Sequence, residues 1–272
     1  MGDSNAIPHR VFLDCDFAII NPLQVDPSEW AGLDCLPIVP KGLDAHEAML
    51  PRLAVLREVS HQNRLALLTQ AEAHQRTDAM PLLSALLVSV ATPAQLVSHL
   101  ARQMVLKTPF RASFLLRYYD PLVFRHLRWI FNARQMAAFL GPVETWHYAI
   151  LDTPYWHRQC VPGCLAEMKP RLDKEQWGRL HRIGLINAVV KKATRASLLL
   201  CEDTALFLKI DGYLKMAIEE AGLTEAGDQQ CYALQALKFG PEYLVEAKTV
   251  QRVARSKSEC VSYVGLCMEE GA

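Results

Sequence analysis

Residues 115–142 read LLRYYDPLVFRHLRWIFNARQMAAFLGP, and they carry the clearest local structural signals of the chain. An apolar run precedes Asp120 and Pro121, which form a strong helix start, because Asp caps free N–H groups and Pro fits the first turn. Asn132 with Gln135 is typical of a second helix cap, and the final Gly-Pro pair ends that helix. The stretch therefore predicts a strand followed by two helices.

Strand-like and helical segments alternate on both sides of this stretch. Residues 10–20 (RVFLDCDFAII) predict a first strand, residues 44–60 a helix, and residues 143–151 a later strand. Thr92, followed by Pro and by Gln95, predicts another capped helix. This alternation is typical of an α/β lobe with a mixed, largely parallel sheet flanked by helices.

Helix-breaking residues and helical sequence patterns divide the chain into three parts. Residues 152–170 contain three Pro and one Gly and are interpreted as a linker. Beyond them Asp173 can cap a helix, and helical periodicity continues to the end. The predicted organisation is an α/β lobe over residues 1–151, a linker over 152–170 and an all-helical bundle over 171–272.

Composition excludes several classes of protein. Lys plus Arg and Asp plus Glu both number 29, which disfavours a nucleic-acid-binding protein because such proteins usually carry a basic surplus. The polar start lacks an apolar export signal, and no apolar run is long enough to span a bilayer. Eight cysteines without an export signal indicate reduced thiols. We expect a cytoplasmic protein that binds neither nucleic acid nor a membrane.

Asp14 and Asp16 are the sharpest chemical suggestion. An Asp-x-Asp after an apolar strand resembles the first motif of haloacid-dehalogenase-type phosphatases, in which one Asp attacks phosphorus and Mg²⁺ lies between the two. The following Phe-Ala-Ile departs from that pattern, and no later apolar strand ends in an acidic pair. A structural role on one strand face is the alternative. No Gly-x-Ser-x-Gly elbow is present, so we expect no catalytic residues, metal ligands or cofactor.

Five residues are candidates for contact with a partner. Arg117 can pair with Asp120, and both either stabilise the helix start or face a partner. Tyr119 belongs to the same motif. Tyr155 and Trp156 lie in the predicted linker, where aromatic side chains are suited to anchor an interface.

The middle of the chain resembles the type VI secretion adaptor-chaperone family, which was long catalogued as a domain of unknown function. The resemblance spans roughly residues 10–150 and rests on an Arg-Tyr-Tyr-Asp-Pro motif, a Phe-Leu-Gly-Pro ending and a Trp-bearing strand. Leu122 departs from the family pattern, which usually has Arg there. The matching positions are Arg117, Tyr118, Tyr119, Asp120, Pro121, Val123, Phe139, Leu140, Gly141, Pro142 and Trp146.

The resemblance implies a cytoplasmic, non-enzymatic protein of a Gram-negative bacterium. Such a protein binds a cognate toxin effector and helps to load it onto the secretion spike, the valine-glycine-repeat protein. We expect the two lobes to hold the effector together. The alternative is a Mg²⁺-dependent phosphohydrolase that uses Asp14 and Asp16, and Mg²⁺-dependent turnover of a phosphate ester distinguishes the two hypotheses.

Overall fold

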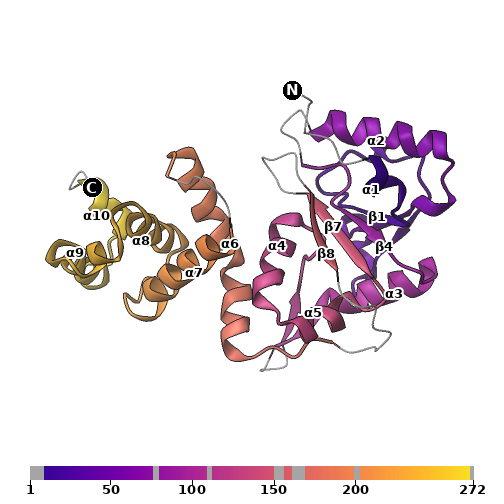
Figure 1. The fold of residues 1–272 in the computed structure, drawn as a ribbon. Coiled ribbons are helices and arrows are strands. Elements are labelled where there is room, and N and C mark those ends of the chain that lie inside the picture. Colours follow the sequence, from indigo (N-terminus) through magenta and orange to yellow (C-terminus); the bar gives the residue numbers. More distant parts are fainter. Residues whose placement is uncertain are drawn as a thin grey trace. The chain divides into compact units, whose positions relative to one another are not determined.

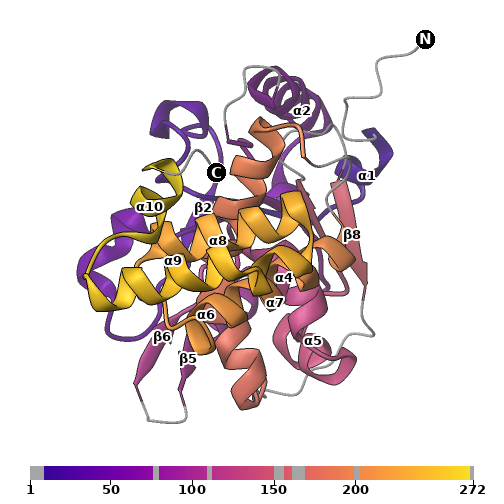
Figure 2. The ribbon, with the colours of Figure 1, turned by 90° about the vertical axis from the view of Figure 1, so that its left-hand side faces the viewer.

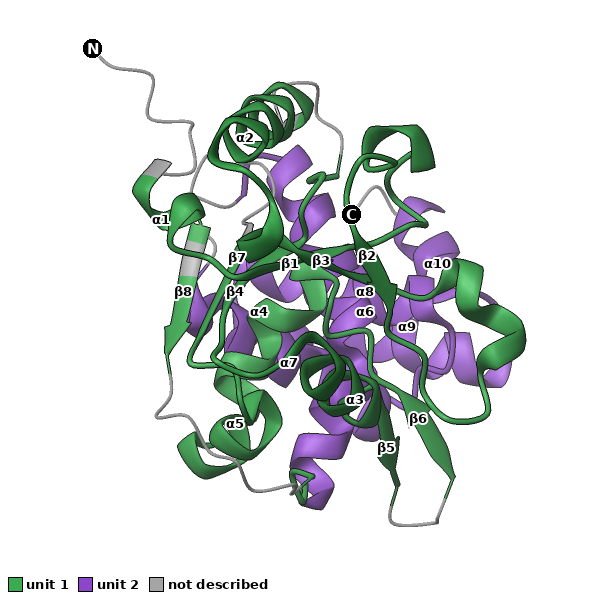
Figure 3. Ribbon diagram, turned by 90° about the vertical axis from the view of Figure 1, so that its right-hand side faces the viewer, with its two compact units in different colours: residues 1–172 green, residues 173–272 purple. Residues whose placement is uncertain are grey.

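The structure is a computed structural model that describes residues 9–75, 80–108, 112–149, 156–160, 169–198 and 203–269. The chain divides into two compact units, residues 1–172 and residues 173–272 (Figures 1 and 3). None of the helices in these ranges is long and apolar enough to cross a membrane.

The first unit contains a six-stranded sheet with the order β2-β3-β1-β4-β7-β8. Every neighbouring pair of strands in it is antiparallel. The prediction of a largely parallel sheet is therefore wrong, although the unit is mixed α/β as expected. The strands are β1 (Phe17–Ile20), β2 (Cys35–Pro37), β3 (Arg52–Val55), β4 (Ala85–Val88), β7 (Thr145–Ala149) and β8 (Trp156–Cys160).

The position of β1 explains why the alternation of strands and helices was misleading. Helix α2 (His61–Gln75) connects β3 to β4, and these two strands run in the same direction. They are not neighbours, because β1 lies between them and pairs with both: Ile19 is opposite Leu53 on one side and Ala85 on the other. A helical connection thus joins strands of like direction here without producing a parallel pair.

Two segments differ from their predicted structure. Residues 10–20 form a short helix and then β1, and residues 44–60 form β3 between two 3₁₀ turns. Pro51 precedes β3 and suits the start of a strand better than the middle of a helix. The remaining elements of this unit are α1 (His9–Leu13), α3 (Pro93–Gln103), α4 (Pro121–Ile130), α5 (Ala133–Leu140), the 3₁₀ turns η1 (Pro27–Glu29), η2 (Asp44–Met49) and η3 (Leu56–Glu58), and a hairpin of β5 (Val105–Lys107) and β6 (Ser113–Leu115).

The predicted helix starts are confirmed. Thr92 and Gln95 form a reciprocal capping box at α3, and Asn132 and Gln135 form another at α5. The Asp120 side chain accepts a hydrogen bond at the start of α4. Each cap satisfies N–H groups that a helix leaves without an internal partner, so these boundaries depend on neighbouring residues alone.

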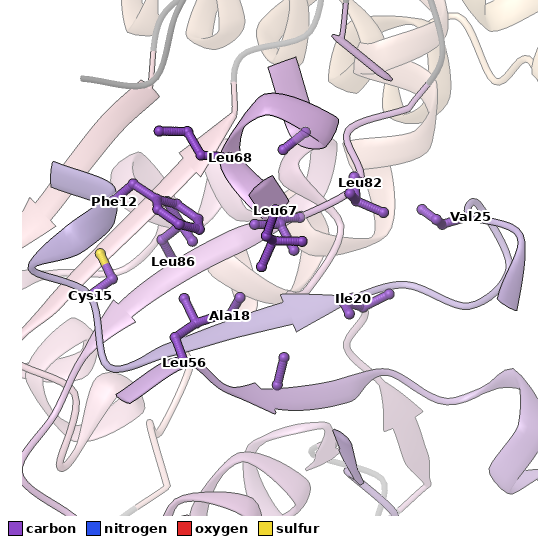
Figure 4. Packing of buried hydrophobic residues seen from close by; sticks show 13 residues of the cluster. Phe12, Cys15, Ala18, Ile20, Val25, Leu56, Leu67, Leu68, Leu82 and Leu86 are labelled. Carbon is purple, nitrogen blue, oxygen red and sulfur yellow. The ribbon is translucent and has the colours of Figure 1, made fainter. Parts of the chain in front are cut away.

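One face of the sheet carries a cluster of buried apolar side chains (Figure 4). Leu67 and Leu68 of α2 pack there with Phe12 of α1 against strand residues that include Ala18 and Leu86. Strand side chains alternate between the two faces of a sheet, so the intervening residues lie on the other face. That second face packs against α3 and α4.

Strand β8 lies within the predicted linker. Its five residues pair with β7, from Thr145 opposite Cys160 to Ala149 opposite Trp156. Residues 156–160 are therefore part of the sheet, and the interpretation of 152–170 as a continuous linker is wrong for them. Residues 150–155 and 161–168 lie outside the described part of the chain.

The second unit is helical, as predicted. Buried apolar side chains such as Ile186 of α6 and Leu214 of α7 form its core. A buried ion pair joins the same two helices, because Arg182 Nε donates to Asp211 Oδ1 at 2.7 Å and Arg182 Nη2 to Oδ2 at 3.2 Å. The elements, coloured orange to yellow in Figure 2, are α6 (Lys174–Arg195), α7 (Thr204–Glu219), α8 (Ala226–Phe239), η4 (Pro241–Val245), α9 (Ala247–Ser258) and α10 (Tyr263–Glu269).

Candidate functional site

The predicted motif follows directly from strand β6, and its side chains alternate between solvent and core. Ser113, Leu115 and Arg117 are exposed, whereas Leu116 and Tyr118 are buried. This period of two continues the strand pattern past the last paired residue. The alternation places the Arg117 side chain on the solvent side of the hairpin.

Tyr118 anchors the motif to the core. Its hydroxyl donates a hydrogen bond to the carbonyl oxygen of Leu100 at 2.9 Å. Its ring meets the rings of Phe139 and Trp146 edge-on, with centroid distances of 5.2 and 5.7 Å. Phe124 stacks on Trp146 at 4.7 Å, which connects α4 to the same aromatic cluster. Tyr118 therefore fixes the position of the backbone that carries Arg117 and Tyr119.

Asp120 caps helix α4 and pairs with Arg117. Its Oδ1 accepts from the Leu122 N–H at 2.9 Å, and its Oδ2 lies 3.6 Å from Arg117 Nη2. Burial raises the pKa of Asp120, while the Leu122 N–H and Arg117 act in the opposite direction because they favour the carboxylate. The predicted cap and ion pair are both present, and they account for Asp120 as a structural residue.

Tyr119 is also a supporting residue. It is only 2% exposed, and burial raises the pKa of its hydroxyl, although a hydrogen bond from Arg117 opposes this shift. The Arg117 guanidinium is therefore held by Tyr119 and by Asp120, yet 47% of its side chain is exposed. Among Arg117, Tyr119 and Asp120, Arg117 is the residue available to a partner.

Of the two aromatic candidates in the predicted linker, the structure describes Trp156, which is not brought to this place. Tyr155 lies outside the described residues. Trp156 is half-buried in β8 and packs against the cluster formed by Phe12 and α2, on the sheet face opposite to α4. Trp156 is therefore a packing residue, and the idea that it anchors an interface at a linker is not supported by its position.

Asp14 and Asp16 do not share a strand. Asp14 is exposed in the turn after α1, and Asp16 precedes β1, where its Oδ2 accepts from the Ser89 N–H at 2.9 Å. Within the described residues, no three His, Cys, Asp or Glu side chains are grouped so that they can hold a metal ion. The strand-end geometry on which the phosphohydrolase hypothesis rested is absent from residues 10–20.

A basic surface surrounds the β5–β6 hairpin, and it was not among the sites predicted from the sequence. Lys107 Nζ donates to Ser113 Oγ at 2.8 Å, and Lys169 Nζ donates to the carbonyl oxygen of Val105 at 2.7 Å. Partial burial lowers the pKa of Lys169, and repulsion from Lys107 and Arg102 lowers it further. An anionic group bound here relieves that repulsion, so the arrangement is suited to bind carboxylates. We call Arg102, Lys107, Arg117 and Lys169 the basic hairpin surface.

The sequence does contain a signal for this surface. No Asp or Glu occurs between Asp78 and Asp120, whereas four Lys or Arg residues do. Three of them, Arg102, Lys107 and Arg117, belong to the basic hairpin surface, and Arg111 lies outside the described residues. Overall neutrality concealed this local excess of positive charge.

Comparison with known proteins gives one match. The sequence model of a family described as Domain of unknown function (DUF4123) matches residues 43–138, from η2 into α5. No curated protein and no solved structure matches the chain. The matched residues lie in the first unit and include the whole motif from Arg117 to Pro121 with the β5–β6 hairpin. DUF4123 is associated with effector adaptors of type VI secretion.

Proposed function

We propose that this protein is a cytoplasmic adaptor that binds a cognate toxin effector and helps to load it onto the type VI secretion spike protein. It acts by holding another protein and carries out no catalysis. The observation that carries the proposal is the family match over residues 43–138, since that family is associated with effector adaptors. Arg117 lies within this range and displays a guanidinium that buried neighbours hold in place.

The basic hairpin surface is the part of the first unit that we assign to effector contact. Leu115 and Arg117 are alternate residues of β6 and its continuation, so both point outward on the solvent side. The exposed fraction is 47% for the Arg117 side chain and 43% for Leu115. A cation beside an exposed apolar side chain is a common composition for a protein interface. The expected counterpart on the effector is an acidic segment, because opposite charges steer and orient association.

Copurification tests the function directly. The tagged full chain is expressed in its source bacterium, and bound proteins are identified by mass spectrometry. The expected partner is a toxin effector whose gene lies beside an immunity gene, or a valine-glycine-repeat spike protein. Reconstitution of the complex from separately purified proteins then checks that the contact is direct. If the chain binds neither class of protein, the adaptor proposal is wrong.

Substitution of Arg117 tests the proposed surface. Arg117→Glu reverses the exposed charge, and we expect the affinity for the identified effector to fall by about tenfold or more, as for a charge pair worth roughly 1.5 kcal/mol or more. Arg10→Glu is the matched control, because Arg10 is an exposed residue of α1, which covers the other face of the sheet. If Arg117→Glu and Arg10→Glu bind the effector with equal affinity, Arg117 is not part of the interface. This result would leave the proposed adaptor function itself standing.

The absence of catalysis has its own test. The purified chain is incubated with Mg²⁺ and a generic phosphate ester, and no turnover is expected. Hydrolysis that depends on Mg²⁺ and disappears in Asp14→Asn would establish the phosphohydrolase alternative instead.

A further inference from the structure

The backbone of strand β6 has one edge that faces away from its partner. In the described part of the chain, β6 pairs with β5 alone. The register places Phe114 opposite Leu106, and the Leu116 N–H donates to the Met104 carbonyl oxygen at 2.7 Å. Backbone groups that point towards a partner strand recur at every second residue. Ser113 and Leu115 therefore direct their N–H and C=O groups away from β5.

The other edge of the hairpin is already occupied. Lys169 Nζ donates to the carbonyl oxygen of Val105 at 2.7 Å, and α3 contacts β5, whereas β6 is the outer strand in Figure 3. Among the described residues, none bonds to the outward backbone groups of Ser113 or Leu115. An unpaired strand edge is a template for a further strand. The hairpin can thus gain a strand beside β6.

The two faces of the hairpin favour different side chains on an added strand. One face carries Lys107, Leu115 and Arg117, which are exposed. The other face carries Leu106, which is 2% exposed, and the half-buried Phe114. Successive residues of a strand point to opposite faces and contact their neighbours across the strands. Acidic side chains on the first face, alternating with apolar side chains on the second, therefore match this edge.

We propose that an extended segment of the effector, with alternating acidic and apolar side chains, binds along β6 as an antiparallel third strand. The identity of the partner rests on the proposed adaptor function, whereas the binding mode rests on the hairpin. Main-chain hydrogen bonds to Ser113 and Leu115 supply affinity in this mode, and side chains supply specificity. A second copy of this edge is a poorer occupant, because it would bring the like charges of two basic hairpin surfaces together.

Synthetic peptides test the pairing on the unmodified full chain. The probe is fluorescein-labelled Thr-Glu-Val-Glu-Val-Glu-Thr, and its binding is measured by fluorescence anisotropy. In the proposed pairing its Glu residues lie opposite Ser113 and Leu115, so N-methylation of Glu removes the N–H groups that face β6 and keeps every charge. We expect this change to weaken binding by about tenfold or more, since more than one main-chain hydrogen bond is lost.

N-methylation of the two Val residues is the matched control. Their N–H groups point away from β6, so the affinity should stay within about twofold of that of the parent peptide. If the Glu-methylated peptide binds as tightly as the parent, charge alone holds the peptide and the added strand is wrong. A parent peptide that does not bind at all refutes the proposal as well.

A variant of the protein tests the same edge from the other side. Leu115→Pro removes an outward N–H without removing a hydrogen bond to β5, and we expect the parent peptide to bind about fivefold or more weakly. Leu115→Val is the control, because it keeps the N–H and an apolar side chain. Circular dichroism and Tm check that both variants are folded. A folded Leu115→Pro variant with wild-type affinity contradicts the proposal, and the peptide comparison on the wild type does not depend on this variant.

The added strand and the adaptor function fail separately. If copurification finds neither a toxin nor a spike protein but the N-methylation pattern holds, the edge binds an acidic strand and only the identity of the partner is wrong. If an effector copurifies but the Glu-methylated peptide binds as tightly as the parent, the adaptor function stands and the added strand is wrong.

Discussion

Replacement of Asp120 by Ala is expected to destabilise the first unit. It removes the acceptor of the Leu122 N–H at 2.9 Å, and the loss of an Asp cap typically costs about 0.5–2 kcal/mol. The ion pair with Arg117 adds at most a few tenths of a kcal/mol, since it spans 3.6 Å and 47% of the Arg117 side chain is exposed. Relief of the desolvation that raises the pKa of Asp120 offsets a part of the loss.

The net expectation is a loss of about 1 kcal/mol, which corresponds to a fall in Tm of about 2–4 °C for a unit of this size. Urea unfolding followed by circular dichroism gives the free energy, and scanning fluorimetry gives Tm. Asp120→Asn is the matched control, because Asn caps a helix about as well as Asp but has no charge for Arg117. It should therefore lie close to the wild type in stability.

Two results would refute this reasoning. If the Ala and Asn variants lose the same stability, the charge of Asp120 matters and its cap does not. If the Ala variant is as stable as the wild type but no longer binds the effector, Asp120 is an interface residue. The second result would also show that the buried position of its carboxylate does not prevent direct contact.

Two further predictions concern the buried residue His147 and the turn at Gly141. His147→Gln should reduce the loss of stability on acidification from pH 6.5 to about 4, because burial and Arg158 lower the pKa of His147 to about 4. The unfolded chain then binds a proton that the folded chain does not, so wild-type stability falls with pH in that range. His61→Gln, at an exposed position of α2, should leave the acid profile of unfolding unchanged. Gly141→Ala should cost more than about 2 kcal/mol in urea unfolding, because φ is +55° and the new Cβ would overlap the His99 ring. Gly32→Ala, where nothing lies within 4 Å, should be nearly neutral, and similar costs for the two would show that the His99 contact is easily relieved.

The helix starts were predictable because their causes are local. Asp120 with Pro121, and Asn132 with Gln135, each satisfy helix N–H groups within a few residues. The sheet order was not predictable in this way. The pairing of Ile19 with both Leu53 and Ala85 depends on contacts between distant segments, which no local pattern records.

The error at residues 10–20 has the same origin. An apolar run of this length fits either a strand or a buried helix. The turn after α1 lets Phe12 and Cys15 both enter the cluster with Leu67 and Leu68, whereas a continuous strand would place these two residues on opposite faces of the sheet because they are three apart. Packing against α2 therefore decided the local structure.

The candidate site was predictable in part. The pairing of Arg117 with Asp120 followed from their spacing, and the structure contains it. The burial of Tyr119 and the packing of the half-buried Trp156 were not predictable, because an aromatic side chain suits a core as well as an interface.

The net charge of the chain is zero, but its charges are not evenly distributed along the sequence. Of 29 basic residues, 4 lie between Asp78 and Asp120, where there is no acidic residue, so the remainder has 25 bases and 29 acids. The chain therefore has segregated charge, with positive charge concentrated around the hairpin. Segregated charge steers association even when the net charge is zero.

The surroundings of this surface also distinguish between kinds of anionic partner. A site for single-stranded nucleic acid combines cations with exposed aromatic rings on which bases stack. Here Tyr118 and Tyr119, the rings nearest to Arg117 in sequence, are 0% and 2% exposed, and the outward neighbour in the row is Leu115. Arg117 is moreover held by Tyr119 and Asp120 before any partner arrives, which reduces the side-chain entropy lost on binding. A preorganised guanidinium beside an aliphatic side chain fits an acidic protein segment better than a nucleic acid.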